Sequence, residues 1–460
     1  MKLEKLFSRY KPIIADYESF LSMLRKPLVQ SFRINTLKAR PDDIALLTSD
    51  LKTCRLPFYE HGFRLERKMS LGNHPAHMLG LLYIQEIASM LPVLVLDPKP
   101  DEVVLDLCAA PGSKTTQIAQ AMDNRGLLVV NEVNNRRKQG LLQNIKRCGL
   151  LNEVVIGLRG QRIDRVFPDY FDRILIDAPC SAEGTVRKSK AVLFHWGVRN
   201  IERMARIQKG LIVSAFRALR PGGVMVYSTC TIAPEENEAV VAYLLERFPE
   251  ADLLPVSIPG IKLRPGITTW QVENFNERIK RCARVLPQDN DTAPFFIAKI
   301  SKMGLQKKRV DYLGKIVYEH SYVVALSRRF GIDNARFQEY AVFHGQDRDT
   351  TYIATPQVFS FREVRTSRKG LEFGKMYGQD IKPDNDCIQI FGKNAKENIY
   401  EMTGSELRRF LKGETVKPSS PRDMTKGFVV LVYKKLPVAI GRYNGQTIKS
   451  AVKRDRRIPQ

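Results

Sequence analysis

The segment EVVLDLCAAPGSKTTQIAQAM, residues 102–122, predicts a strand, a tight turn and a helix in succession. Its first six residues are mostly aliphatic and β-branched, and the run ends at the Pro-Gly pair of the turn. In the following KTTQIAQAM, Ile118, Ala119 and Met122 recur at helical spacing. We interpret this stretch as the beginning of a βαβ fold.

The alternation of strand and helix continues to about residue 250. Further strands are predicted at 127–132, 153–158, 172–179 and 224–230, and helices at 137–148, 200–219 and 234–248. The second helix of this set is expected to stop at Pro221-Gly222-Gly223, and the third to start at Pro234. Strands separated by helices predict an α/β fold with a mostly parallel, doubly wound sheet.

The chain is too long for one ordinary hydrophobic core, so 460 residues predict two or three domains. Residues 1–95 are less regular and are expected to form a small α+β N-terminal region, with one strand in SFRINTLK, 31–38. Residues 96–302 are expected to form the α/β domain, whose last part, 255–300, adds strands.

The sequence changes character beyond the basic segment SKMGLQKKR, 301–309, which is interpreted as a linker. Residues 311–460 are predicted to form a C-terminal region. In GFVVLVYKKLPVAIGRYNGQTIKS, 427–450, short β runs alternate with turn residues. This pattern is typical of a small β-barrel, expected over about 388–460.

The net charge of the chain indicates the kind of partner that it binds. The chain has 74 Lys and Arg against 49 Asp and Glu, a formal net charge of +25 and a sequence pI near 9.8. Such an excess favours a polyanionic partner, because phosphate neutralisation supplies much of nucleic-acid affinity.

The N-terminus MKLEKLFSRYKPII lacks a signal-peptide core, and no apolar run is long enough to cross a bilayer. A cytoplasmic protein without a membrane contact is therefore expected, and nothing in the sequence demands more than a monomer. Seven cysteines without a CxxC pair argue against a disulfide framework and a structural zinc site, so reduced thiols are expected.

The chemically informative residues follow the predicted strands. In open parallel sheets, ligands bind at the carboxyl ends of the strands. The residues at those ends are Asp106 to Lys114, Glu132, Asp177 to Cys180, and Cys230. Because all four groups of residues follow predicted strands, we expect them to form one site.

The turn LDLCAAPGSK has small residues that let a ligand approach the backbone. It does not match a P-loop, because Ser113 separates Gly112 from Lys114. It also lacks the spacing of GxGxxG. Glu132 ends the second strand, where an acidic residue commonly accepts from ribose hydroxyls. A nucleoside ligand without a pyrophosphate fits this pattern better than a dinucleotide does.

Asp177 and Cys180 lie within four residues and can face one pocket together with Cys230. A carboxylate can hold a base edge, and a thiolate can add to an electron-poor carbon. Lys114 and the helix expected near Pro234 are candidates for lowering the pKa of Cys230. The alternative for either cysteine is a buried, inert thiol.

Five motifs together resemble the Sun (Fmu) family of RNA cytosine-C5 methyltransferases. They are FRINTLK, HPAHMLGLLYIQEIASMLPVLVL, LDLCAAPGSKTTQIAQ, ILIDAPCSAEGTVRK and LRPGGVMVYSTCTIAPEENEAVV. They occur in the family order and cover about residues 30–300. The chain is most similar to the bacterial 16S ribosomal RNA enzymes with a C-terminal RNA-binding domain of PUA type, which residues after 310 match more loosely.

The resemblance implies S-adenosylmethionine as methyl donor, with Glu132 on its ribose. The turn that would hold this cofactor consists of Cys108, Ala109, Ala110, Pro111, Gly112, Ser113 and Lys114. The resemblance also implies that Cys230 is the nucleophile that adds to cytosine C6 and that Cys180 helps to release the product. Asp177 would contact the cytosine edge and the methionine end of the cofactor, and Lys114 would help to activate the site.

One departure from the family pattern follows the third strand. The family usually places an Asp near the adenine, often in Asp-Gly-Arg, whereas Arg159, Gly160 and Gln161 occupy that position here. Asp164 lies downstream. Cofactor affinity or the adenine contacts are expected to differ accordingly.

Several residues are candidates for RNA contact, with a solvated surface charge or core packing as the alternative for each. Backbone contacts are predicted for Arg33, Asn35, Arg187, Lys188, Lys434 and Lys435, and base stacking for Phe194, His195 and Trp196. The predicted activity is RNA cytosine-C5 methylation, acting on small-subunit ribosomal RNA. Transfer RNA as substrate and a noncatalytic RNA-binding assembly factor are the competing hypotheses. A DNA substrate fits less well, because DNA enzymes use the cysteine of a Pro-Cys motif, whereas this chain also has the cysteine of the STC motif, Cys230.

Overall fold

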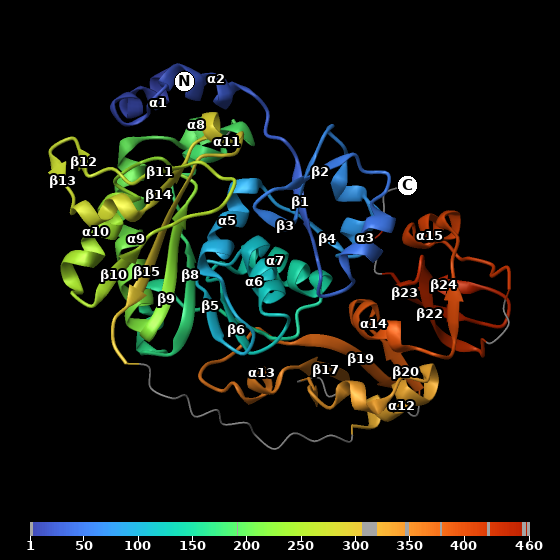
Figure 1. Ribbon diagram of the computed structural model, residues 1–460. Coiled ribbons are helices and arrows are strands. Elements are labelled where there is room, and N and C mark those ends of the chain that lie inside the picture. Colours follow the sequence, from blue (N-terminus) through green and yellow to red (C-terminus); the bar gives the residue numbers. More distant parts are fainter. Residues whose placement is uncertain are drawn as a thin grey trace.

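The computed structural model describes residues 3–190, 192–305, 320–345, 349–377, 380–420, 424–452 and 457. The α/β sheet and its helices fill one side of the molecule, at the left of Figure 1. The four-stranded sheet of the N-terminal region lies beside it, and the C-terminal region lies below and to the right. The described residues contain no helix that is long and apolar enough to cross a lipid bilayer.

The large sheet has a parallel centre. Its parallel strands, in spatial order, are β7 (Glu153–Ile156), β6 (Leu127–Asn131), β5 (Val103–Asp106), β8 (Phe171–Asp177) and β9 (Leu219–Thr229). The antiparallel strands beyond β9 are β15 (Phe295–Lys302), β14 (Ala283–Val285) and β11 (Leu263–Pro265), and β10 (Ala251–Leu254) also pairs with β15. The sheet therefore runs outward in both directions from β5, which confirms the predicted doubly wound fold.

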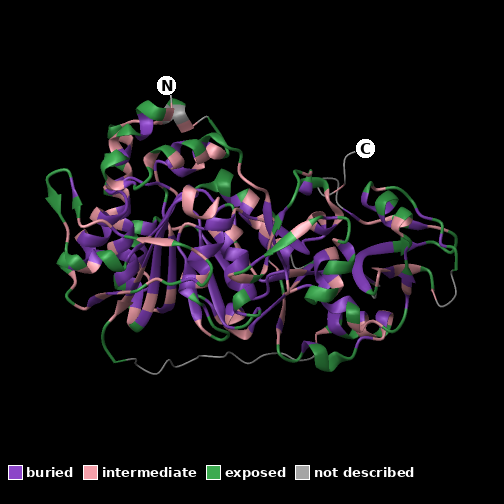
Figure 2. Ribbon diagram, turned by 45° about the horizontal axis from the view of Figure 1, so that its top comes forward, coloured by how far each residue is buried: buried purple, intermediate pink, exposed green. Residues whose placement is uncertain are grey.

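Helices cover both faces of this sheet, whose strands are largely buried (Figure 2). One face packs against α5 (Ile87–Leu96), α6 (Ser113–Ala121) and α7 (Asn135–Cys148), and the other against α9 (Val198–Ala218) and α10 (Glu238–Arg247). Short elements of this part are α8 (Val192–His195), α11 (Pro287–Asn290), β12 (Thr269–Trp270) and β13 (Glu273–Asn274).

One predicted strand start, at residue 224, and one predicted helix start, at Pro234, were wrong. The helix α9 ends at Ala218, and β9 begins at Leu219, so the Pro221-Gly222-Gly223 sequence lies inside the strand. The helix after Cys230 begins at Glu238 instead of Pro234. Asn237 explains the delay, because its side chain accepts from Thr229 Oγ1 and donates to the Thr231 carbonyl, holding the intervening residues as turns.

The N-terminal region contains a small antiparallel sheet. Its strand order is β2 (Thr53–Leu56), β3 (Tyr59–Leu65), β1 (Ser31–Ile34) and β4 (Leu82–Ile84). The helices of the region are α1 (Leu3–Phe7), α2 (Tyr17–Arg25), α3 (Pro41–Leu47) and α4 (Pro75–Met78). The first two lie over the α8 end of the α/β domain (Figure 1).

The C-terminal region contains two four-stranded sheets. The first has the order β16 (Ala341–His344), β17 (Thr350–Ala354), β19 (Leu371–Tyr377) and β20 (Asp380–Pro383), and the second β21 (Ile399–Glu401), β22 (Gly427–Tyr433), β23 (Leu436–Tyr443) and β24 (Ile448–Ser450). The helices are α12 (Ser321–Phe330), α13 (Pro356–Ser360), α14 (Asn385–Phe391) and α15 (Gly404–Leu411). The β runs predicted in 427–450 are thus strands.

The C-terminal region is joined to the α/β domain through the large sheet. Its strand β18 (Arg368–Lys369) pairs antiparallel with β7, and Arg368 Nε donates to buried Glu153 at 2.9 Å. Val358 and Phe361 enter the core of the α/β domain. The segment from α13 to β18 is therefore packed onto the α/β domain.

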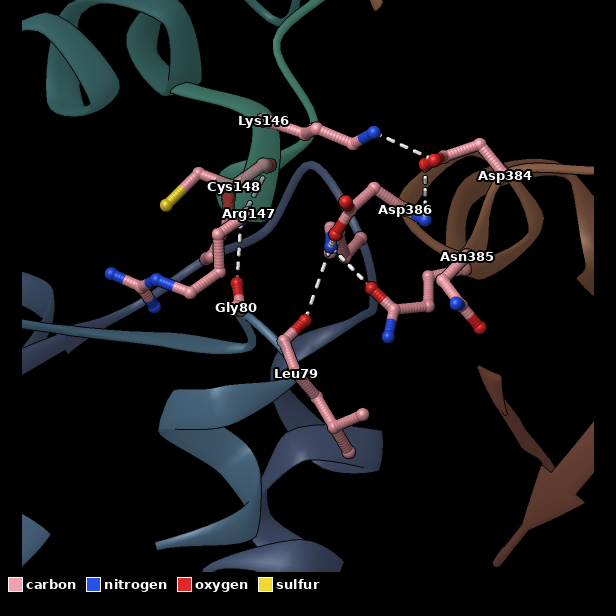
Figure 3. Close-up of polar contacts among 12 residues, drawn as sticks. Leu79, Gly80, Lys146, Arg147, Cys148, Asp384, Asn385 and Asp386 are labelled. Carbon is pink, nitrogen blue, oxygen red and sulfur yellow. Dashed lines mark hydrogen bonds and ion pairs between the residues drawn. The ribbon is translucent and has the colours of Figure 1, made fainter. Parts of the chain in front are cut away.

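A buried ionic cluster connects all three parts (Figure 3). Lys146 of α7 lies 2.6 Å from Asp384 and also binds Glu372. Lys38, from the N-terminal FRINTLK motif, is buried 3.2 Å from Asp386 and donates to the Leu79 carbonyl at 3.1 Å. Charges taken out of water need such partners, so the cluster fixes how the three parts meet.

Candidate active site

A pocket of about 340 Å³ lies at the carboxyl ends of the parallel strands. This is the edge where the chain crosses from one half of the doubly wound sheet to the other, and where ligands bind in such folds. The residues lining it are Leu107, Cys108, Ala110, Asn131, Glu132, Val133, Arg137, Arg159, Gly160, Gln161, Asp177, Ala178, Pro179, Cys180, Ala182, Ile207, Leu211 and Cys230. The structure thus brings the predicted strand-end residues together.

The predicted cofactor turn contributes unequally to the pocket. Cys108 and Ala110 line it, whereas Ala109, Pro111, Gly112, Ser113 and Lys114 form the turn and helix start behind them. Gly112 has φ 104°, a conformation that favours glycine, and a Cβ there would approach Leu141 to 3.0 Å. Arg137 donates to the Ala110 carbonyl at 2.7 Å, which holds the turn against α7.

Glu132 is a buried carboxylate at the end of β6. Its Oε1 accepts from the Asn134 N–H at 2.8 Å, and its Oε2 lies 3.5 Å from Arg137 Nη1. An anionic acceptor with lone pairs left over suits the hydroxyls of a ribose.

Asp177 is fixed by two neighbours. Lys114 Nζ lies 2.7 Å from Asp177 Oδ2 and 2.9 Å from Ser89 Oγ, while Ser228 Oγ donates to Asp177 Oδ1 at 3.1 Å. Lys114 is buried, so its charge acts first on this carboxylate. The ion pair orients Asp177 in the pocket wall between β8 and β9.

Cys180 and Cys230 are adjacent, with their sulfur atoms 3.3 Å apart. Both are free thiols, as are the other five cysteines, and both are half-buried. The hydrogen bond to Cys230 and burial raise the pKa of Cys180 above its ordinary range, so Cys180 stays protonated at neutral pH. The helix end expected to act on Cys230 starts only at Glu238, four residues later than predicted.

Sequence reasoning missed the carboxylates that hold the two cysteine loops. Glu236 Oε2 accepts from the Ser181 N–H and from Gln208 Nε2, both at 2.9 Å. Glu183 accepts from Thr231 Oγ1 at 2.7 Å. The available signal for Glu236 is the acidic Pro-Glu-Glu sequence after Cys230, which the pattern alone predicts to be a helix start.

The loop after β7 departs from the family pattern, because residues other than Asp occupy the position where the family usually has one. Arg159, Gly160 and Gln161 line the pocket. Asp164 points elsewhere, because it accepts from Ser214 Oγ at 2.7 Å and lies 3.6 Å from Arg217. Asp164 therefore does not take the place of the missing carboxylate.

The structure contradicts three of the predicted RNA contacts. Arg33 and Asn35 are fully buried, and the buried guanidinium of Arg187 binds the carbonyls of Lys26, Pro27 and Thr292 and the carboxylate of Asp291. Their polar groups satisfy other parts of the protein, so these predictions were wrong.

Of the other candidates for RNA contact, some are exposed to solvent and others form hydrogen bonds within the protein. Lys188 and Lys435 are exposed, and Lys434 donates to the Leu46 carbonyl at 2.7 Å. Phe194 is 85% exposed, whereas Trp196 Nε1 donates to Glu183 at 2.6 Å. The side chain of His195 lies outside the described residues.

Replacing Asp106 by Asn is expected to flatten the pH dependence of stability between about pH 4 and pH 7. Burial raises the pKa of Asp106 from 3.8 to about 7. Within this window the folded state keeps a proton that the unfolded chain has released, so the free energy of unfolding falls as pH rises, by up to about 1.4 kcal/mol per pH unit. Denaturant unfolding of both proteins across the window measures the difference, and equal slopes would contradict it.

A doubly wound sheet with a nucleoside-sized pocket at its switch point and two adjacent thiols in the pocket wall has the features of a methyltransferase. The sequence matches the N-terminal domain of 16S rRNA methyltransferase RsmF over residues 4–87, 16S rRNA methyltransferase RsmB/F over 93–301, and the methyltransferase RsmF PUA domain over 397–458. The chain belongs to the RsmF family of methyltransferases. This confirms the resemblance and the fold predicted from the motifs.

Individual relatives support the same assignment. The chain is 32% identical over 465 residues to the ribosomal RNA small subunit methyltransferase F of Aeromonas salmonicida, covering 96% of this chain and 94% of that protein. It is 41% identical over 302 residues to the tRNA (cytosine(49)-C(5))-methyltransferase of Pyrococcus abyssi, covering 65% of this chain and 96% of that protein.

Solved structures resemble about two thirds of the chain. A methyltransferase homolog from Pyrococcus horikoshii superposes with a TM-score of 0.59 at 35% identity, over 66% of this chain and 96% of that one. The NSun6 of Pyrococcus horikoshii, solved with SFG, gives a TM-score of 0.57 at 26% identity, over 65% of this chain and 98% of that one.

Proposed function

We propose that this methyltransferase transfers the methyl group of S-adenosylmethionine to C5 of a cytosine in small-subunit ribosomal RNA. The observation that carries the proposal is the contact between Cys180 and Cys230 in the wall of the pocket. Two thiols at one point suit a reaction in which a sulfur atom is added to a base and later expelled.

The pocket residues fit the proposed cofactor. The volume of the pocket lies in the range of small-molecule sites. The buried Glu132, at the end of β6, offers an acceptor for ribose hydroxyls. Ala110 lets a ligand approach the turn closely, and Gln161 stands where the family's Asp is missing. When bound, the cofactor supplies an electrophilic methyl group. A structural relative solved with the S-adenosylmethionine analogue SFG supports this assignment.

Each site residue has a role in the proposed reaction. The Cys230 thiolate forms a bond to C6 of the cytosine, and the displaced electron pair makes C5 nucleophilic so that it accepts the methyl group. Asp177, oriented by Lys114, holds the base edge. After methylation the C5 proton passes to solvent, the C6–S bond breaks, and the Cys180 thiol hydrogen-bonds to the departing Cys230 sulfur.

The substrate is proposed from the full-length relatives, whose name specifies small-subunit ribosomal RNA. Transfer RNA remains a second candidate because of the more identical, shorter relative from Pyrococcus abyssi. Coverage favours ribosomal RNA, since the tRNA enzyme matches only 65% of this chain, whereas the small-subunit ribosomal RNA enzyme matches 96% of it. A cytoplasmic location, a monomeric state and the domain limits 1–95, 96–302 and 311–460 stay predictions.

The test is transfer of a labelled methyl group from S-adenosylmethionine into separate pools of small ribosomal subunits, free ribosomal RNA and transfer RNA. We expect label in small-subunit RNA as 5-methylcytosine. Label confined to transfer RNA would favour the second candidate. Cofactor binding without label in any pool would support a noncatalytic RNA-binding factor instead.

A further inference from the structure

The aromatic side chain of Phe194 is exposed where α8 ends and α9 begins, a corner formed by residues 194–198. Phe194 of α8 is 85% exposed, and Val198, the first residue of α9, is 45% exposed. Trp196 between them is held by Glu183. Because apolar surface in water is unfavourable, this corner is a candidate for contact with a partner.

The same corner is strongly basic. From Lys188 to Arg206 the sequence has five Lys and Arg residues and one acidic residue, Glu202. Arg199, Arg203 and Arg206 are exposed and share one face of α9, because they are four and three residues apart. An aromatic ring beside arginines fits single-stranded nucleic acid, whose bases stack on rings and whose phosphates bind cations.

The arginine face leads toward the pocket. Ile207 and Leu211 of α9 line the pocket. Gly210 continues the arginine face, and a Cβ there would lie 3.0 Å from Cγ of the pocket residue Gln161. At 1.5 Å per residue, Arg199 and Ile207 are about 12 Å apart along the helix axis. RNA on this surface is therefore close enough to present a neighbouring nucleotide to the site.

We propose that Phe194 stacks on a base flanking the target nucleotide, and that Arg199 and Arg203 bind the adjoining phosphates. The inference rests on the proposed function, because it identifies where the RNA strand enters the site. An enzyme that modifies a base must hold it out of its stack, and a fixed flanking base helps to do so. The corner thus contributes to RNA binding, whereas the cysteine pair forms and breaks the covalent bond to the base.

The first experiment compares Phe194→Leu, which keeps an apolar side chain without a ring, with Phe194→Trp. Binding of small-subunit ribosomal RNA is measured directly, independent of turnover. Loss of stacking is expected to weaken binding about tenfold in Phe194→Leu, and Phe194→Trp is expected to bind like wild type. Cofactor binding and thermal unfolding are expected to stay unchanged in both variants.

The second experiment follows the salt dependence of RNA binding in an Arg199→Ala/Arg203→Ala variant. Losing two phosphate contacts to a single strand is expected to reduce the slope of log affinity against log salt by about 1.4. Arg217→Ala is the matched control, because Arg217 is exposed at the opposite end of the same helix. The control is expected to keep the wild-type slope.

The outcomes separate this inference from the proposed function. If wild type binds ribosomal RNA and methylates it, but Phe194→Leu and the double arginine variant bind it as wild type does, the inference is overturned. If the variants weaken binding while wild type transfers no methyl group to any RNA, the inference holds and the proposed function fails.

Discussion

Cys230→Ala is expected to reduce methyl transfer to background, a loss of at least about a thousandfold. Without the sulfur atom no bond to C6 can form, and cytosine C5 stays a poor nucleophile, so the whole covalent route is lost. The side chain is half-buried at the end of β9, and its replacement removes few packing contacts. RNA binding and thermal unfolding are therefore expected to remain near wild type, which a labelled-transfer assay and a binding assay measure side by side.

Cys54→Ala is the matched control for this prediction. Cys54 is an exposed cysteine on β2 outside the pocket residues, so its replacement is expected to leave methyl transfer unchanged. Comparable loss in both variants would point to general thiol sensitivity instead of nucleophilic catalysis.

Cys180→Ala tests the other half of the cysteine pair. This variant can still form the C6–S bond, but it lacks the thiol that contacts the departing sulfur. We expect a covalent protein–RNA adduct to accumulate, visible as a shifted band on a denaturing gel. Accumulation of the adduct in Cys230→Ala instead would reverse the assignment of the two cysteines.

The sequence predicted the centre of the fold because local patterns determine it. Most of the parallel strands contain a short apolar run, and β5, β6, β8 and β9 are each followed by residues that line the pocket. Since the strands are parallel, their carboxyl ends had to meet at one edge of the sheet. Glu132, Asp177, Cys180 and Cys230 could therefore be grouped without knowing any contact between them.

Long-range contacts escaped prediction. The pairing of β18 with β7 joins residues that are more than 200 positions apart in sequence, and no local pattern in Arg368–Lys369 announces it. The carboxylates Glu183 and Glu236 were likewise missed, because acidic residues are usually solvated and their burial depends on the loops around them. Deleting the residues after 310 would consequently uncover the edge of the large sheet at β7.

Arg33 is the clearest example of a long-range contact that the sequence did not predict. A basic residue in a chain of this charge suggests a phosphate contact, but Arg33 is fully buried between β1 and α6. Its Nε donates to Gln85 at 2.9 Å, its Nη1 to Gln120 at 2.7 Å, and its Nη2 to Thr116. Burial lowers the pKa of the guanidinium, because the charged form loses its water.

Arg33→Ala is expected to lower the free energy of unfolding by about 3–5 kcal/mol. The substitution opens a cavity and leaves the oxygens of Gln85, Gln120 and the Ser113 carbonyl without this donor. Urea unfolding with the matched control Arg64→Ala measures the effect; Arg64 is an exposed arginine on the neighbouring strand β3, and its replacement is expected to change stability by less than about 0.5 kcal/mol.

The two interpretations of Arg33 make opposite predictions for RNA binding. If Arg33 is structural, the fraction of Arg33→Ala that stays folded at low temperature binds RNA with wild-type affinity and salt slope. If Arg33 contacts a phosphate, stability stays near that of Arg64→Ala while the salt slope falls by about 0.7. The hydrogen bonds of the guanidinium favour the first outcome, because a side chain that holds β1 against α6 has no donor directed to solvent.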